Sequence, residues 1–347
     1  MTRVVFVTQQ VDPAHPALAA TVPKVAALAA LVHEVVVLAD AAVDGVLPTN
    51  CRVRTFRSGT KAGRGLRFEA LLGRELRGLR DGAVVAHMCP VYAVLAAPLV
   101  RPVGVPLVLW FTHWKASRLL QAAERVSTAV ASVDVRSFPL ASRKVVAIGH
   151  GIDLDEFPCV EREPAVTKGI RLLALGRTSP AKGLDVVVRA VAESGDGVRL
   201  DVHGPSLTEE ERAHRVVLGA LVRDLGLVER VTLGDAVRRT DVPELLTTHD
   251  ALVNNMRAGA PDKVVYEAAA SCVPVLASNP VFDSLLDPDQ RFARDDAAEL
   301  AARIGRLAAL DPATRAEIGK RLRERVRDGH SVQSWARGIL AAAGLGA

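Results

Sequence analysis

Short apolar runs recur along the whole chain, and each is followed by a stretch whose apolar residues have helical spacing. This alternation is typical of βα units, whose parallel sheet is buried on both faces. We therefore expect two doubly wound α/β domains, one for each series of runs. The first series, which starts at residues 4, 34, 84, 106, 129 and 145, is VVFV, EVVVLA, VVAHM, PLVLWF, AVASV and VVAI. The second series, which starts at residues 170, 199, 230, 250 and 273, is IRLLAL, RLDVHG, RVTLG, DALVNN and VPVLAS.

The linker between the two series is expected within residues 149–169. This segment, GHGIDLDEFPCVEREPAVTKG, is rich in Gly, Pro and charge and has no periodicity. The pattern places an N-terminal domain at residues 1–155 and a C-terminal domain at residues 165–328. The remaining segment, residues 329–347, predicts a helix in which we expect a structural role for Trp335.

The composition indicates a globular protein. A chain of 347 residues can bury two cores, and 24% charged with 49% hydrophobic residues is ordinary for such a protein. The aromatic content of 4% argues against a carbohydrate module that stacks sugars on rings. The most apolar region, residues 93–111, is interrupted by Pro, Gly and Arg, whereas a membrane-spanning helix needs about twenty uninterrupted apolar residues.

The four cysteines lie far apart, without a CxxC pair or a nearby histidine cluster. This spacing favours reduced thiols over a zinc site or a disulfide framework. The first residues, MTRVVFVTQQ, are expected to form a buried strand and not a secretion signal. Both observations predict a cytoplasmic protein.

The net charge of +5 is concentrated in residues 51–80, which contain nine Lys or Arg against two Glu. The segment 66–79 predicts an amphipathic helix with leucines on one face and arginines on its flanks. Such a helix can lie on an anionic membrane surface, which we would expect to involve residues 61–80. It can equally pack its leucines on the sheet and leave its arginines solvated, or contact an anionic soluble partner. Nucleic acid is not expected, because no interleaved aromatic residues accompany the charge.

The segment GRTSPAKG, residues 176–183, follows an apolar run and precedes an amphipathic one. A strand that ends in a Gly-initiated turn and leads into a helix directs free backbone N–H groups at one point, which suits phosphate. Gly176 starts the turn, and Arg177 and Lys182 would add two mobile cations. The spacing matches neither GxGxxG nor GxxxxGK[ST]. A glycine-capped turn with solvated charges is the alternative interpretation.

A second segment, DKVVYEAAASCVPVLAS at residues 262–278, predicts a helix, a turn and a strand. Together the two segments resemble the donor-binding half of retaining glycosyltransferases of family four, which have the GT-B fold. The resemblance implies that Arg177 and Lys182 clasp the diphosphate of a nucleotide sugar and that Glu267 holds its ribose. It also implies that the helix start, at Asp262, Lys263 and Val264, faces the donor.

The chain departs from the family pattern at Gly259. Members usually carry a first glutamate eight positions before Glu267, where it contacts the transferred sugar. The segment GAPDK, residues 259–263, is similar to a subset with an Asp-Lys loop before the helix. Recognition of the hexose is therefore open, whereas diphosphate binding uses other residues.

The first half adds to the resemblance through HMCPVYAVL, WFTHWKAS and GHGID, which look like a bacterial subgroup of the family. His113 matches a histidine that lies near the reacting sugar, although a structural role for it is the alternative. The loop that contains Gln9, Gln10 and Asp12 is expected on the acceptor side. The implied fold has two Rossmann-like domains facing a central cleft, with the C-terminal helix crossing back to the N-terminal domain.

The function implied is metal-independent transfer of a sugar from a nucleoside diphosphate sugar to an acceptor hydroxyl, with retention of configuration. The resemblance implies no cofactor and no metal site. The acceptor is open; a lipid-linked molecule, a glycan and a natural-product intermediate all fit. Two other interpretations stay open. One is a degenerate GT-B protein that binds a nucleotide or a partner without turnover, and the other is a nucleotide-sugar 2-epimerase.

Overall fold

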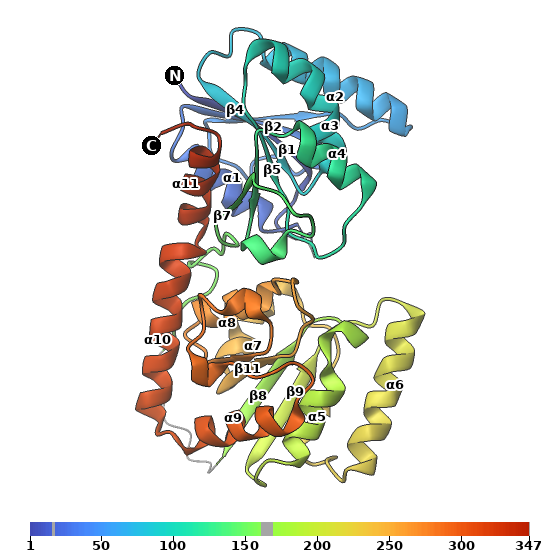
Figure 1. Cartoon of the computed structure of the whole chain (residues 1–347), viewed down its shortest axis with the longest axis vertical. Helices are drawn as coiled ribbons and strands as arrows, with labels where there is room; N and C mark the ends of the chain where they lie inside the picture. The colour runs from blue at the N-terminus through green and yellow to red at the C-terminus, as the bar shows by residue number, and fades with distance from the viewer. Residues whose placement is uncertain (16–17, 161–168, 347) are drawn as a thin grey trace. The chain divides into compact units, whose positions relative to one another are not determined.

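The computed structural model of the protein describes residues 1–15, 18–160 and 169–346 (Figure 1). The chain divides into two compact units, the first made of Met1–Asp153 with Gly329–Ala347 and the second of Leu154–Asp328. Part of the expected linker, residues 161–168, lies outside the described residues. Each unit is a parallel α/β layer structure with its own core, as the two series of apolar runs predict.

The described residues of the first unit form a seven-stranded sheet of order β3-β2-β1-β4-β5-β6-β7, whose printed strand pairs are all parallel. Helices α2, α3 and α4 cover one face, and α1 and α11 cover the other (Figure 1). The strands are β1 (Arg3–Val11), β2 (Glu34–Ala42), β3 (Cys51–Thr55), β4 (Gly82–His87), β5 (Leu107–Trp110), β6 (Ala129–Ser132) and β7 (Val145–Ala147). The helices are α1 (Thr21–Ala29), α2 (Lys61–Glu75), α3 (Pro90–Val100), α4 (Arg118–Val126) and α11 (Val332–Ala342).

The second unit contains a five-stranded sheet of order β10-β9-β8-β11-β12 in its described residues. Helices α5, α6 and α9 pack together on one face, and α7 and α8 lie on the other (Figure 1). The strands are β8 (Ile170–Leu175), β9 (Val198–His203), β10 (Val231–Leu233), β11 (Ala251–Asn254) and β12 (Val275–Ala277). The helices are α5 (Leu184–Ala192), α6 (Glu209–Asp224), α7 (Val242–Thr247), α8 (Lys263–Ala270), α9 (Ala297–Ala309) and α10 (Pro312–Gly329).

Every apolar run identified in the sequence becomes a strand, so the expected α/β fold of two doubly wound sheets is confirmed. Strand β3, CRVRT, was missed because charged residues interrupt its apolar pattern. It pairs with β2 at the edge of the sheet, with Val35 opposite Cys51. An edge strand tolerates, and often uses, exposed charge. None of the helices in the described residues is long and apolar enough to cross a membrane.

The basic helix α2 begins at Lys61, five residues before the expected start, because the Thr60 side chain accepts a hydrogen bond from the Gly63 N–H. Its Phe68 and Leu72 are buried against the sheet. Leu76 and Leu79 are also buried, but they lie beyond the end of the helix at Glu75. The apolar face therefore packs within the first unit, while Leu66 remains 68% exposed.

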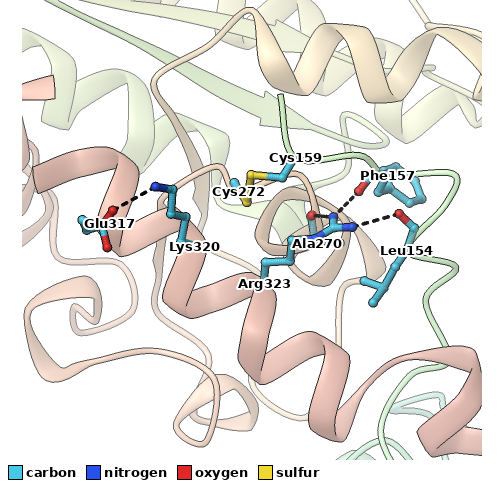
Figure 2. The surroundings of a disulfide bond; sticks show 8 residues. All are labelled: Leu154, Phe157, Cys159, Ala270, Cys272, Glu317, Lys320 and Arg323. Carbon is cyan, nitrogen blue, oxygen red and sulfur yellow. Dashed lines mark hydrogen bonds and ion pairs between the residues drawn. A yellow bond between two sulfur atoms is a disulfide. The ribbon is translucent and has the colours of Figure 1, made fainter. Parts of the chain in front are cut away.

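The expectation of four reduced cysteines is wrong, because Cys159 and Cys272 form a disulfide (Figure 2). The two residues are 113 positions apart, and their Cα atoms lie 5.1 Å from each other. Only the fold brings the segment after the unit boundary against the turn that follows α8, so spacing along the chain could not show the pair. Cys51 and Cys89 are free thiols, and burial raises their pKa values to about 11 and about 12.

Arg323 of α10 reinforces the region around the disulfide. Its guanidinium donates to the carbonyl oxygens of Phe157 at 2.5 Å and Leu154 at 3.2 Å, and to that of Ala270 (Figure 2). One side chain thus joins α10, the end of α8 and the chain segment that enters the second unit.

Helix α11 is anchored in the first unit by Trp335, which is fully buried. Its ring packs edge-on against Trp110 with centroids 5.7 Å apart, and the Lys24 ammonium lies 5.2 Å from the Trp335 ring centroid. Gly151 has φ of 76°, and a Cβ atom there would lie 3.1 Å from the Trp335 ring and 2.5 Å from the end of the Lys24 side chain. The glycine in GID therefore has a packing role beside the tryptophan.

Replacing Trp335 with Ala should lower the free energy of unfolding by about 3–5 kcal/mol, because it leaves a large cavity between α11 and the sheet. The matched control is Trp114→Ala, since Trp114 is 40% exposed and should cost less than about 1 kcal/mol. Chemical denaturation followed by far-UV circular dichroism measures both. Equal losses in the two variants would contradict the anchoring role of Trp335.

Candidate functional site

The turn after β8 places a lysine at the carboxyl end of the second sheet. Gly176 has φ of 128° and Gly183 has φ of 56°, conformations that glycine adopts without strain, and a short 3₁₀ turn, η3 (Pro180–Lys182), lies between them. The Lys182 ammonium donates to the Leu175 carbonyl at 3.0 Å and contacts the Asp262 carboxylate. Its side chain is only 12% exposed. Lys182 is therefore a fixed cation and not the mobile one expected.

Asp262 links this turn to the start of α8, 80 residues further along the chain. The residue is the N-cap of α8, but its side chain does not cap the helix. It accepts instead from Lys182 and, at 2.7 Å, from the Asn254 side-chain amide at the end of β11. The turn after β8, the end of β11 and the start of α8 thus meet at one carboxylate.

Arg177 is also paired, but it points to a different helix. Its guanidinium lies 2.7 Å from the Glu211 carboxylate of α6, and its side chain is 52% exposed. Burial raises the pKa of Glu211, but the N–H groups of Leu207 and Thr208 and the Arg177 charge outweigh it, so the net shift is downward. Arg177 and Lys182 therefore lie in one turn, each held by its own carboxylate.

Glu267 is buried one turn into α8 and is held by two cations. Arg239, in the 3₁₀ turn η4 (Arg239–Asp241), lies 2.5 Å from its carboxylate, and Lys263 lies 2.8 Å from it. Arg239 also pairs with Glu156 at 2.9 Å and lies 4.9 Å from the ring centroid of Phe157. Burial alone would raise the pKa of Glu267, but the charges of Lys263 and Arg239 lower it below the ordinary value. The carboxylate is thus ionised and fixed in place.

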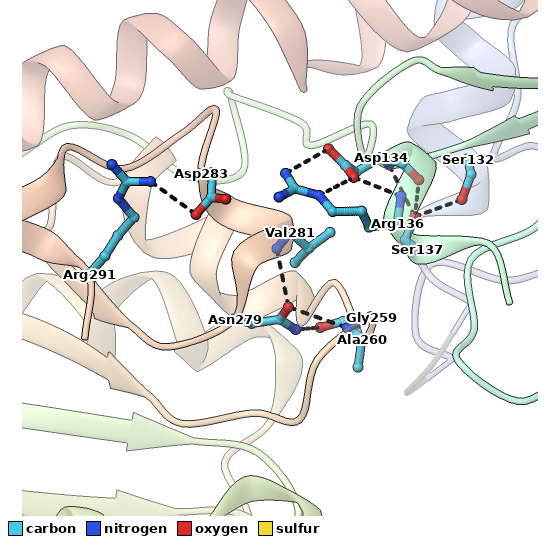
Figure 3. A network of polar contacts seen from close by, with 10 residues as sticks. All are labelled: Ser132, Asp134, Arg136, Ser137, Gly259, Ala260, Asn279, Val281, Asp283 and Arg291. Carbon is cyan, nitrogen blue, oxygen red and sulfur yellow. Dashed lines mark hydrogen bonds and ion pairs between the residues drawn. The ribbon is translucent and has the colours of Figure 1, made fainter. Parts of the chain in front are cut away.

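The loop before α8 explains the departure at Gly259. This residue has φ of 78°, a conformation in which a glutamate would be strained. Figure 3 shows the buried Asn279 side chain holding the loop, where it donates to the carbonyl of Ala260 at 2.9 Å. Its oxygen accepts from the N–H groups of Gly259 at 3.3 Å and Val281 at 3.1 Å. The backbone of this loop is therefore built for glycine.

His113 lies in the exposed loop after β5 of the first unit. Its Nδ1 accepts from the Lys115 N–H at 3.0 Å, and its ring stacks on Trp114 with centroids 5.5 Å apart. Burial and the charge of Lys115 lower the pKa of His113. The two contacts fix the ring while leaving it accessible.

A second loop of the first unit is held more tightly. In it, Asp134 caps the 3₁₀ turn η2 (Val135–Ser137), and its carboxylate accepts from the Arg136 N–H at 2.8 Å (Figure 3). The buried Ser132 and Ser137 hydroxyls are hydrogen-bonded to each other at 2.8 Å.

Gln9 and Gln10, expected on the acceptor side, line a pocket of about 400 Å³ within the first unit. The third expected residue, Asp12, is not among the lining residues. Its carboxylate accepts from the Ala14 N–H at 2.8 Å and so stabilises a turn. Other lining residues, Asp40, Lys61, Arg64 and Tyr92, come from β2, α2 and α3.

Sequence reasoning missed Arg239, Asn254, Asp40 and Tyr92. Arg239 stands in an ordinary charged loop, and Asn254 was included in a strand without a role. The contacts of these residues depend on partners that only the fold brings near, which no local pattern indicates. Among the residues that the structure describes, no group of three or more His, Cys, Asp or Glu side chains could hold a metal ion. The metal-independent reaction stays a prediction.

Comparison with known proteins shows what part of the chain resembles. Residues 184–341 match the family model described as glycosyl transferase-like. D-inositol 3-phosphate glycosyltransferase of Mycobacterium marinum is 32% identical over 142 residues, which are 39% of this chain and 30% of that protein. The matched segment thus spans less than a third of that relative's length.

Solved structures match the whole chain. The Anabaena protein Alr3699/HepE in complex with UDP has a TM-score of 0.75 at 18% identity, with 99% of each chain covered. A glycosyltransferase from Rickettsia africae has a TM-score of 0.74 at 14% identity, covering 99% of this chain and 97% of that one. WaaG, a glycosyltransferase involved in lipopolysaccharide biosynthesis, has a TM-score of 0.61 at 17% identity, with 99% of each chain covered.

These likenesses define the fold as that of the GT-B glycosyltransferases, with two parallel-sheet Rossmann-like domains. Residues 184–341 match the glycosyl transferase-like family model, and the expectation of an enzyme of the glycosyltransferase class agrees with that model, with the Mycobacterium relative and with the Rickettsia structure. Assignment to family four and to the subgroup with the Asp-Lys loop stays a prediction.

Replacing Glu267 with Gln should lower the free energy of unfolding at neutral pH by about 3 kcal/mol, because Arg239 and Lys263 lose a buried counter-charge. Because the folded-state pKa lies below the ordinary glutamate value of 4.5, this stabilisation is complete above 4.5. It is lost as the pH falls through the lowered value. The difference between variant and wild type should therefore shrink in acid.

Urea denaturation at a series of pH values measures this difference. Glu317→Gln is the control, since Glu317 is 59% exposed in its pair with Lys320 and should change stability by less than about 1 kcal/mol. A Glu267→Gln loss that does not depend on pH would contradict the ionised cluster.

Proposed function

We propose that the protein is a retaining, metal-independent glycosyltransferase of family four that uses a nucleoside diphosphate sugar. The observation that carries the proposal is the contact between Lys182 and Asp262, which brings the turn after β8 to the N-terminus of α8. Both features suit a diphosphate, because the turn supplies cations and the helix start supplies N–H groups. UDP-sugars are the first candidates, since the Anabaena structures contain UDP or UDP-glucose.

In the proposed reaction, negative charge grows on the β-phosphate as the bond from the sugar C1 to oxygen breaks. Lys182, Arg177 and the backbone N–H groups at the start of α8 stabilise that charge more in the transition state than in the ground state. The departing phosphate takes the proton of the acceptor hydroxyl, and that hydroxyl bonds to C1 on the same face. Glu267, held between Arg239 and Lys263, binds the ribose hydroxyls.

The cytoplasmic location stays a prediction, and so does the contact of residues 61–80 with an anionic membrane surface. Arg74 of α2 is exposed, as such a contact needs, whereas Arg64 pairs with Asp40 at 3.2 Å. Only part of the positive charge of this segment is therefore available to a membrane. The disulfide is of a kind that is rare in a reducing compartment, so it counts against the cytoplasm.

Lys182→Ala and Arg177→Ala should each lower the turnover of donor hydrolysis by roughly a hundredfold. This is the usual effect of removing one group that stabilises the developing charge. The assay uses a panel of UDP-, GDP- and dTDP-sugars with EDTA present. Lys320→Ala is the control, because Lys320 is 54% exposed on α10.

Donor binding is measured separately by thermal stabilisation. A donor at a hundred times its dissociation constant should add about 2.7 kcal/mol of stability. Wild-type rates in both variants would exclude the diphosphate role. No response of the wild-type protein to any donor would favour the degenerate binding protein instead.

His113→Ala should lower turnover by roughly a hundredfold while leaving the affinity for UDP unchanged, because we propose that the ring orients the transferred sugar and does not bind the nucleotide. The stacking on Trp114 and the hydrogen bond from Lys115 support this positioning role. Kinetics with the active donor, together with a UDP titration, test it. Full turnover in the variant would show that His113 is structural.

A further inference from the structure

The pocket of the first unit is lined by both polar and apolar side chains, and its apolar residues include Leu18, Val91 and Leu95. Gln9 and Gln10 lie near the end of β1, Asp40 lies near the end of β2, and Lys61 and Arg64 lie in the first turn of α2. Its volume of about 400 Å³ is within the range of sites for small molecules. All of these residues belong to one unit, so the pocket is complete without the other.

Positive charge exceeds negative charge among these residues. Arg64 contacts the Asp40 carboxylate at 3.2 Å, whereas Lys61 makes no ion pair with any residue that the structure describes. The first turn of α2 contains no acidic residue, although acidic side chains stabilise a helix N-terminus and lysine there is unfavourable. Residues that are unfavourable for the local structure are most often found at functional positions. The excess charge therefore favours an anionic group on the ligand.

Asp40 adds an observation of a different kind. One of its carboxylate oxygens, Oδ1, is buried and has no hydrogen-bond partner among the described residues. A buried acceptor without a donor is costly, and a ligand hydroxyl would satisfy it. The side-chain amides of Gln9 and Gln10 can both donate and accept beside it. The lining thus suits hydroxyl groups as well as an anion.

We propose that this pocket holds the acceptor and that the acceptor is a small polyhydroxylated molecule bearing an anionic group. Lys61 and Arg64 bind the anionic group, and Asp40 with the two glutamines binds hydroxyls. The assignment of the ligand as acceptor rests on the proposed glycosyltransferase function. Ligand binding at the pocket does not, and can be tested without any donor.

The test is a titration of the wild-type protein with four probes at low and high salt: glucose 6-phosphate, glucuronate, glucose and inorganic phosphate. We expect a sugar bearing phosphate or carboxylate to bind at least about tenfold more tightly than glucose, since a charge-assisted hydrogen bond is worth roughly 1.5–3 kcal/mol. The preferred sugar identifies which anion the pocket takes. Weaker binding of inorganic phosphate would show that the hydroxyl contacts contribute.

Lys61→Gln should weaken binding of the preferred anionic sugar by about tenfold and leave glucose unaffected. The matched control is Arg74→Gln, which removes one positive charge from the same helix at an exposed position outside the pocket. UDP affinity is measured in all three proteins, so that a failure of the donor site is seen separately. Equal binding of glucose and the anionic sugars, or equal losses in the two variants, would overturn the proposal.

Discussion

The buried carboxylate of Glu267 is the interaction on which the second unit depends. A charge taken out of water is costly unless it is paired, and here two cations from different elements compensate it. Lys263 comes from the same helix, but Arg239 comes from a separate turn and also reaches Glu156, near the start of the unit. The ion cluster thus fixes α8, η4 and the entering chain to one another. Because the nearby disulfide and Arg323 hold the other end of α8, this helix is constrained along its whole length.

A rigid α8 matters because the helix presents its N-terminus to the turn after β8. The contact between these segments, Lys182 with Asp262, spans the carboxyl edge of the sheet. In a parallel sheet, all loops at this edge follow the strands, so residues far apart in sequence converge there. The glycines at 176 and 183 allow the sharp turn, and the glycine at 259 allows the loop before α8. The backbone conformation at these glycines therefore brings Lys182 and Asp262 into contact.

The sequence predicted those parts of the molecule that depend on local rules. Apolar runs located the strands, and the glycine-rich turn with Arg177 and Lys182 follows β8 as the sequence pattern indicated. Strand β3 escaped because its stability depends on β2 beside it and not on its own apolar pattern. The disulfide and the role of Arg239 escaped for the same reason, since each is defined by a partner that only the fold brings near. The periodicity of the sequence indicates each helix or strand, but it does not indicate which residues of different elements pair.

The charges of the two units differ in a way that bears on their roles. In the second unit, Arg177, Lys182 and Glu267 each have a partner of opposite sign, so the arrangement is fixed before a ligand binds. Preorganised charge of this kind is suited to stabilising a transition state, because no reorganisation is needed during the reaction. In the pocket of the first unit, Lys61 has no such partner among the described residues, and Asp40 has an unsatisfied oxygen. A ligand that supplies the missing interactions of these two groups binds more tightly than one that does not, which is the basis of selective recognition.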